Sequence, residues 1–370
     1  MGPPSASSSQ RMNPETKKRW VLFGVFLAAV VIIYKISVHG QSKSTSSANS
    51  VRGSSFSVWG ESSRDEYSFA MVADLDRMSK VADSKKPNFR SIFQRGTLKR
   101  KRDGTFEVEF GDKHDMFCRL NEEGRGCEMS ELVVWRHELY TFDDRTGGVF
   151  KVTKDLDLIP EIILMEGDGQ NSKGQKTEWA TVKDDVLMVG SFGKEYVRGG
   201  KVTSTNNMWI ATIDSNGGVQ HIDWKSTYGK IRKQVNAEYP GYIVMEAMHW
   251  DPVGREWWIL PRRISSEPYD EKKDERKGSN IVLVANEAMT TFREMRVGPQ
   301  IELRGWSSLT FLPNTRNKVI VALKTSEVED KVSGDADQSS FITVFTSTGE
   351  VLLPQTEIPG GVKFEGIEIL

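Results

Sequence analysis

The chain has 370 residues, of which 38% are hydrophobic, and its formal net charge is −1. This length and apolar content allow one large domain with a substantial core. The near-neutral charge gives no long-range field for nucleic acid, so we expect no nucleic-acid partner. Ten tryptophans and many short β-branched runs favour an all-β fold.

The N-terminal region predicts a membrane anchor. Residues 1–19 are polar and rich in Ser, Pro and basic side chains, as in a disordered tail. An apolar run of 15 residues extends from Trp20 to Tyr34, and Lys17 to Arg19 precede it, which places the tail in the cytosol. We expect residues 20–38 to be a single transmembrane helix, the signal-anchor of a type II membrane protein. The Ser-rich residues 39–67 would form a lumenal stem. The alternative is a cleaved signal peptide, which would give a secreted form.

Strands and turns follow to the C-terminus. A pattern of strand, turn and strand, starting on an oxygen-bearing side chain and ending near a basic one, covers 130–145, 178–194, 246–262 and 307–324. A fifth copy is split between 365–370 and 68–77. The opening residues lie 48, 68, 61 and 58 positions apart, a period typical of a propeller. We therefore predict that residues 68–370 form an all-β, five-bladed β-propeller, closed by pairing of its N- and C-terminal strands.

The segments between the copies are expected to supply outer strands. These are predicted at 89–100, 105–110, 147–152, 159–165, 208–214, 219–223, 281–286, 291–297, 341–346 and 351–353. Residues 113–126 are expected to be a charged connector and 226–236 a helical insert. Residues 266–278 are either a solvated polar loop or a lid over the channel.

Propeller geometry brings the five opening side chains together. The first strand of each blade lines the central channel, so their oxygen atoms converge on one face. These residues are Ser130, Glu178, Glu246, Ser307 and Glu365. Three carboxylates require a counter-charge, and Ca²⁺ accepts about 6–8 oxygen ligands in irregular geometry. Outside this ring we expect a rim of cations that could receive phosphate, namely Arg77, Arg145, Lys194, Arg262 and Lys324.

Motifs in a constant order then reveal a family resemblance over some 300 residues. They are VADLD (72–76), GRGCEMSEL (124–132), LYTFDDRTG (139–147), GDG (167–169), TEW (177–179), GKE (193–195), LPRR (260–263), DERKG (274–278), VALK (321–324) and FEGIE (364–368). The chain resembles the calcium-activated nucleotidases, or apyrases. The resemblance implies a propeller with an axial calcium ion held by the same five residues, and hydrolysis of nucleoside di- and/or triphosphates. Its membrane-anchored members imply a preference for UDP and GDP and a lumenal role in the endoplasmic reticulum or Golgi, where UDP left by glycosyltransferases is removed. A homodimer stays open.

The expected mechanism assigns two groups of residues around the metal. Arg145, Lys194, Arg262 and Arg263 would neutralise phosphate oxygens. One acid would orient or deprotonate the attacking water, and the candidates are Asp74, Asp76, Asp144 and Glu195. Each of these acids could equally be only the structural partner of a neighbouring base.

Two other functions stay open, and so does the redox state of the two cysteines. The propeller could be a non-catalytic, metal-stabilised binding module, or, less well supported, a glycosidase with paired carboxylates. Cys118 and Cys127 could form a disulfide in an oxidising lumen or remain free thiols.

Overall fold

The computed structural model describes Gly2 and residues 65–82, 88–329 and 336–370. Apart from Gly2, the expected tail and the transmembrane segment 20–38 lie outside these ranges, as does most of the stem. Within the described ranges, none of the helices combines the length and the apolar character needed to span a bilayer.

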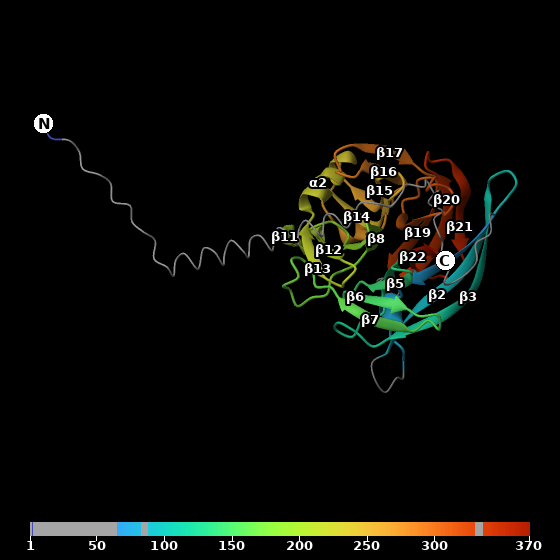
Figure 1. Ribbon diagram of the computed structural model, residues 1–370, viewed down its shortest axis with the longest axis horizontal. Helices are drawn as coiled ribbons and strands as arrows, with labels where there is room; N and C mark the ends of the chain where they lie inside the picture. The colour runs from blue at the N-terminus through green and yellow to red at the C-terminus, as the bar shows by residue number, and fades with distance from the viewer. Residues whose placement is uncertain (1, 3–64, 83–87, 330–335) are drawn as a thin grey trace. The chain divides into compact units, whose positions relative to one another are not determined.

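Five four-stranded antiparallel sheets surround a central axis and confirm the five-bladed propeller (Figure 1). From the innermost strand outward, blade 1 consists of β22 (Phe364–Ile369), β1 (Glu66–Ala73), β2 (Phe89–Arg100) and β3 (Phe106–Cys118). Blade 2 consists of β4 (Met129–Trp135), β5 (Glu138–Asp143), β6 (Gly148–Val152) and β7 (Leu158–Ile163). Blade 3 consists of β8 (Trp179–Lys183), β9 (Val186–Gly190), β12 (Trp209–Ile213) and β13 (Val219–Asp223).

The last two blades follow the same order along the chain. Blade 4 consists of β14 (Tyr242–Asp251), β15 (Glu256–Ser265), β16 (Ile281–Asn286) and β17 (Phe292–Arg296). Blade 5 consists of β18 (Arg304–Phe311), β19 (Val319–Glu329), β20 (Ala336–Thr346) and β21 (Val351–Ile358).

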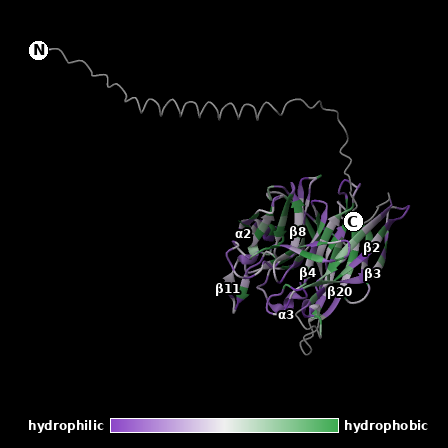
Figure 2. Ribbon diagram, turned by 60° about the horizontal axis from the view of Figure 1, so that its bottom comes forward, coloured by the Kyte–Doolittle hydropathy of each residue, from purple (hydrophilic) through white to green (hydrophobic). Residues whose placement is uncertain are grey.

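The core consists of five apolar layers, each between two neighbouring blades. Successive side chains of a strand point to opposite faces, so each strand supplies two layers. In β1, Phe69 and Met71 pack against blade 5, whereas Ala70 and Val72 pack against blade 2. This two-sided burial explains why the strands read as nearly continuous apolar runs, and Figure 2 shows the contrast between these strands and the hydrophilic loops.

Pairing of the terminal strands closes the ring as predicted. β22 pairs antiparallel with β1, with Phe69 opposite Ile369 and Val72 opposite Gly366. A side chain at Gly366 would place its Cβ 2.5 Å from the carbonyl carbon of Glu131, so only glycine allows β22 to approach β4 this closely. β1 nevertheless ends at Ala73, and Asp76–Ser79 form a short 3-10 helix (η1) instead of continuing the strand to residue 77.

Several boundaries differ from the expectation. β3 extends to Cys118, so the first half of the expected connector 113–126 is strand, because Met116 and Cys118 bury their side chains beside blade 2. The outer strands of blade 5 are also longer than predicted. β20 begins at Ala336 instead of residue 341, and β21 ends at Ile358 instead of residue 353. The helical insert is confirmed as α2 (Lys225–Gln234), and the polar loop contains the one-turn helix α3 (Glu271–Asp274).

An additional hairpin, not predicted, follows β9. It consists of β10 (Tyr196–Arg198) and β11 (Lys201–Ser204), joined by Gly199 and Gly200 at φ 57° and 73°. Two residues of positive φ are what a two-residue hairpin turn requires, so this Gly-Gly pair was the available sequence signal. Cys118 and Cys127 are both buried and are free thiols in this structure.

Candidate functional site

Four of the five predicted ring residues lie at a break in the regular pairing of an inner strand, and the fifth, Glu178, immediately precedes β8. Ser130 and Glu131 together face one residue of β5, between the pairs Met129–Asp143 and Leu132–Thr141. The other three breaks lie at Glu246, Ser307 and Glu365. The pairing of β8 with β9 is regular, and the Glu178 amide donates to the carbonyl of Gly190. A bulge turns a side chain away from the usual alternation. Four bulges therefore direct these side chains away from the interblade layers, and Glu178 lines the same cavity as Glu246 and Glu365.

The two serine hydroxyls link neighbouring ring positions. Ser130 donates from Oγ to the carbonyl of Thr177, at 2.8 Å, and Ser307 donates to the carbonyl of Phe364, at 3.1 Å. Each acceptor immediately precedes a ring glutamate in the next blade. Because the proton of each hydroxyl is used in this bond, the oxygen lone pairs remain available as ligands.

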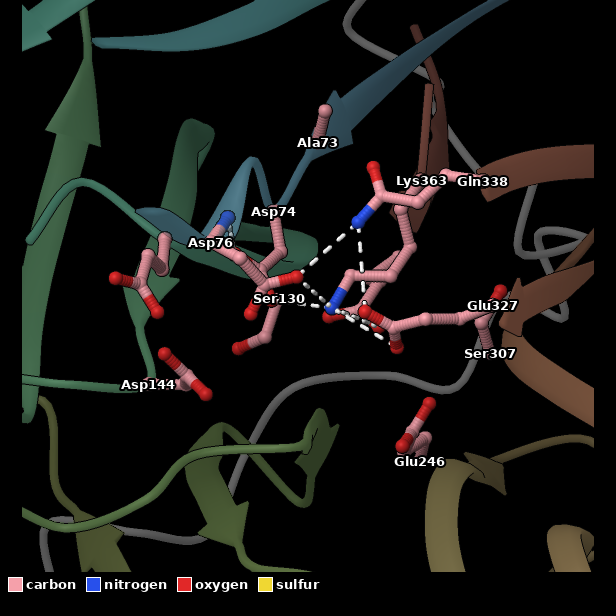
Figure 3. Close-up of polar contacts among 12 residues, drawn as sticks. Ala73, Asp74, Asp76, Ser130, Asp144, Glu246, Ser307, Glu327, Gln338 and Lys363 are labelled. Carbon is pink, nitrogen blue, oxygen red and sulfur yellow. Dashed lines mark hydrogen bonds and ion pairs between the residues drawn. The ribbon is translucent and has the colours of Figure 1, made fainter. Parts of the chain in front are cut away.

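A cavity of about 660 Å³ opens over the three ring glutamates. Most of the predicted site residues line it, and Figure 3 shows several of them converging from different blades. The lining includes Asp74, Asp76, Arg77, Asp144, Arg145, Glu178, Lys194, Glu246, Arg262, Arg263 and Glu365. Ser130 and Ser307 are buried below them.

Basic side chains offset the charge of the ring glutamates. Arg262 contacts both Glu246 and Glu365, the latter at 2.9 Å from its Nη1. Lys176 lies 2.9 Å from Glu178 and also contacts Asp144. Burial still raises the pKa of Glu178 to about 8, because Lys176 only partly offsets the burial and the nearby Glu246. Burial likewise raises the pKa of Glu365, with Glu246 contributing. Burial and the proximity of other acids therefore disfavour the charged forms of Glu178 and Glu365, and a further bound cation would relieve this.

A second acidic cluster lies at the edge of the same cavity. One oxygen each from Asp74, Asp76 and Glu128 lies within 4.8 Å of the others, a spacing that could hold a metal ion. Lys363 contacts Asp74 at 2.6 Å and Asp76 at 2.9 Å, and Arg125 contacts Glu128. Burial raises the pKa of Asp74 to about 7 and that of Glu128 to about 8. Like the ring glutamates, this cluster is therefore already paired with basic side chains.

The structure does not bring Glu195 and Lys324 into the cavity. After β9 the chain turns at Gly193, at φ 72°, and Glu195 instead makes a two-oxygen contact with Arg232, at 2.9 and 3.0 Å. Lys324 is fully buried between blades 4 and 5, donates to the carbonyl of Ser279 and lies 4.0 Å from the centre of the Trp306 ring. The prediction that Lys324 belongs to the cationic rim is therefore wrong.

Three basic residues of the site were not predicted from the sequence. Lys176 and Lys363 each precede a ring glutamate by two positions, and Arg125 precedes Glu128 by three. A spacing of two places side chains on the same face of an extended segment. The repeated Lys-x-Glu at 176–178 and 363–365 was the sequence signal that could have identified two of these counter-charges.

Comparisons with known proteins agree with this architecture. The apyrase family model matches residues 75–370. Apyrase apy-1 of Caenorhabditis elegans is 37% identical over 307 residues, covering 82% of this chain and 84% of that protein. Soluble calcium-activated nucleotidase 1 of Rattus norvegicus is 38% identical over 307 residues, covering 82% and 74%. An apyrase of Cimex lectularius is 35% identical over 309 residues, covering 82% of each chain. The chain therefore belongs to the apyrase family, a class of nucleotide phosphatases.

Proposed function

We propose that this protein hydrolyses nucleoside diphosphates and triphosphates to release phosphate, in a calcium-dependent reaction that prefers UDP and GDP. The observation that carries the proposal is the set of four bulges at Ser130, Glu246, Ser307 and Glu365, together with Glu178 immediately before β8, at a cavity that basic residues also line. The relatives named calcium-activated nucleotidase support both the metal and the substrate class.

The donor set suits a hard dication. Three carboxylates and two hydroxyl oxygens, from five strands, form the wide oxygen-rich environment that Ca²⁺ accepts and the small octahedral Mg²⁺ does not. These five residues would hold the ion. When bound, calcium supplies Lewis-acid polarisation of a phosphate oxygen and activation of water. Arg262, Lys176 and Lys363 would then be less engaged by the ring carboxylates.

Several cavity side chains suit phosphate binding. The Nε of Arg145 and the Nη1 of Arg263 are buried and have no hydrogen-bond partner among the described residues. An unpaired guanidinium donor is costly to bury, so an anionic ligand is the natural acceptor for both. Together with Lys194 and Arg262 they would neutralise and orient the phosphate oxygens, and Lys176 and Lys363 add further positive charge.

Asp144 is the strongest candidate for orienting the attacking water. Its side chain is 5% exposed, one oxygen contacts Lys176, and its Oδ1 has no hydrogen-bond partner among the described residues. Asp74 and Asp76 line the same cavity but are held by Lys363. Glu195 is held by Arg232 and does not line this cavity. A free carboxylate oxygen in the cavity is what general-base assistance requires.

The cellular role is proposed from the N-terminal sequence and the relatives. The apolar run from Trp20 to Tyr34 supports a type II anchor in the membrane of the endoplasmic reticulum or Golgi, with the propeller in the lumen. There the enzyme would remove UDP produced during glycosylation. A cleaved, secreted form and a homodimer are alternatives within this proposal.

Phosphate release from UDP, GDP, ADP and ATP by the full-length protein tests the function. The expected result is hydrolysis with calcium, fastest for UDP and GDP, and much slower hydrolysis with magnesium in calcium-free buffer. Equal rates with magnesium alone would refute the calcium site. No phosphate from any nucleotide would favour the non-catalytic binding module instead.

A further inference from the structure

The two cysteines of the chain lie at the two ends of the connector between blades 1 and 2. Cys118 is the last residue of β3, the outermost strand of blade 1, and Cys127 lies two residues before β4, the innermost strand of blade 2. Both side chains are buried in the same apolar layer between these blades. The chain contains no other cysteine, so any disulfide within one molecule must join these two residues.

The connector folds back on itself and brings its ends together. Glu122 and Arg125 exchange two backbone hydrogen bonds, at 2.8 and 3.0 Å, and the two residues between them have φ of 52° and 79°. Two successive positive φ values are typical of a tight hairpin turn. The two sides of this turn approach closely, because a Cβ at Gly126 would lie 2.2 Å from the carbonyl oxygen of Leu120. The turn therefore returns the chain to the end of β3.

The two thiols are in contact with each other. Met116 and Cys118 face the same side of β3, because they lie two positions apart in a strand, and the Sγ of Cys127 lies 3.9 Å from the carbonyl oxygen of Met116. Burial raises the pKa of the Cys127 thiol, and a hydrogen bond with the Cys118 thiol adds to this rise. The Sγ of Cys118 also lies 3.9 Å from the carbonyl oxygen of Leu120. A thiol is a weak hydrogen-bond donor, so little is lost when two such groups are joined covalently.

The connector between the cysteines carries charged side chains to the main cavity. Arg125 lines that cavity, where its guanidinium lies 3.2 Å from Asp76 and donates to Glu128 at 2.8 Å. Glu122 lies 3.8 Å from Arg145. The position of the connector therefore affects the charges on this wall of the cavity.

We propose that Cys118 and Cys127 are joined by a disulfide in an oxidising compartment, and that this bond holds the connector with Arg125 at the cavity wall. The lumenal location is part of the proposed function, but the bond does not depend on the hydrolysis of any nucleotide.

The bond forms by exchange with the disulfide of a small or protein thiol of that compartment. One cysteine thiolate attacks this disulfide, and the second thiolate then attacks the resulting mixed disulfide. The two cysteines lose two electrons and two protons, and the oxidant leaves as two thiols. Because both thiols are buried, we expect the exchange while the chain folds or when the connector opens locally.

Peptide mapping of the purified full-length protein tests the bond. The protein is equilibrated with protein disulfide isomerase in a glutathione buffer as oxidising as that of the endoplasmic reticulum, and free thiols are then alkylated in denaturant. Trypsin cuts after Arg119 and Arg125, between the cysteines, so the bond is detected as peptide 114–119 linked to peptide 126–136. We expect most of the protein to give this linked pair. Alkylation of both cysteines without reduction, or a disulfide-linked dimer on a non-reducing gel, would overturn the proposal.

Limited trypsin digestion of the native protein tests what the bond does. Arg119 is exposed in the connector, and Arg276 is exposed in the polar loop as an internal control. Reduction should speed cleavage at Arg119 about 10- to 100-fold, because the bond restricts the opened connector, and should leave cleavage at Arg276 within twofold. Samples are reduced after quenching, since the disulfide would otherwise keep the two products together.

A double variant serves as the matched control. Cys118→Ala with Cys127→Ala should be cut at Arg119 like the reduced parent, and reductant should not change its rate. The reduced parent keeps both side chains, so it separates loss of the bond from loss of packing. Equal cleavage of the oxidised and the reduced parent at Arg119 would show that the bond does not hold the connector.

Discussion

The inner strands carry two layers of buried carboxylates that are neutralised in different ways. At the cavity, Glu178, Glu246 and Glu365 lie beside basic side chains. Among the described residues, Glu131 on β4 and Glu368 on β22 receive hydrogen bonds only from hydroxyls and backbone amides. Ser308 donates to Glu131 at 2.7 Å and Thr310 donates to Glu368 at 2.8 Å. No basic residue within the described ranges forms an ion pair with either.

This difference indicates two different roles for acids in one channel. Burial raises the pKa of Glu131 well above its usual value, and the bonds from Ser308 and the Leu132 amide offset it only in part. Glu131 and Glu368 join neighbouring inner strands through these hydrogen bonds, and burial disfavours the charged form of each. The ring glutamates line one cavity beside cations, and in the proposed function a dication would replace those cations. The layer at the cavity is suited to exchange, and the deeper layer is not.

The largest effect is expected from deleting residues 365–370, which removes a glutamate from each layer together with the closing strand. The edge of β1 would be exposed, and blade 1 would lose Ile367 from its layer with blade 5. We expect an unstable, aggregating protein without activity. Thermal unfolding and size-exclusion chromatography measure this, with Glu365→Gln as the control that should keep the fold but bind calcium weakly. A deletion variant that melts like the parent would show that β22 does not close the ring.

Arg262→Ala tests the cation at the ring. Turnover should fall about 10- to 100-fold, because a charge-assisted contact contributes about 1.5–3 kcal/mol to transition-state binding. Without calcium the variant should also lose about 3–5 kcal/mol of unfolding free energy, since Glu246 and Glu365 are left buried without this partner. Saturating calcium should restore most of that stability. Denaturant titrations with and without calcium measure both, and a loss that calcium does not reduce would contradict the exchange of cations.

Lys324 extends the comparison to a buried cation without a carboxylate. Burial lowers its pKa to about 7, with Arg304 adding to the effect. The unfolded chain therefore holds this proton more tightly than the native protein between about pH 7 and about pH 10, and the unfolding free energy rises with pH across that window. Lys324→Met should remove about 2 kcal/mol of the rise between about pH 7 and about pH 9. If the unfolding free energy of parent and variant changed with pH in the same way, Lys324 would be charged in the folded protein.

Glu131→Gln should produce the smallest effect. An amide has the shape of a protonated carboxyl group, so the bond from Ser308 can be kept, and we expect a stability change below about 1 kcal/mol. Activity should stay within twofold of the parent. Denaturant unfolding and a phosphate assay measure these, and a loss of calcium-dependent activity would place Glu131 functionally with the ring.

The repeat spacing predicted the five blades and which inner-strand residues share a level, because both depend only on the period of the pattern. It could not predict bulges, which depend on how two strands pair. Arg262 lies at a pairing irregularity of β15 and reaches the ring, whereas Lys324 pairs regularly with Trp306 and turns into the layer between blades. Both end a repeat copy in the same way, so the sequence pattern alone does not separate them. Glu195 was misplaced for a related reason, since Gly193 redirects the chain toward the β10–β11 hairpin.

Calcium binding by three variants tests the central claim most directly. Calorimetric titration of calcium into the full-length protein is compared for Glu246→Gln in the ring, Glu131→Gln in the deeper layer and Asp74→Asn in the second acidic cluster. We predict that Glu246→Gln loses at least about tenfold in affinity, because one of three ligand charges is removed. Glu131→Gln and Asp74→Asn should bind calcium within about threefold of the parent. Full binding by Glu246→Gln together with lost binding by Asp74→Asn would contradict the account and move the metal to the cluster of Asp74, Asp76 and Glu128.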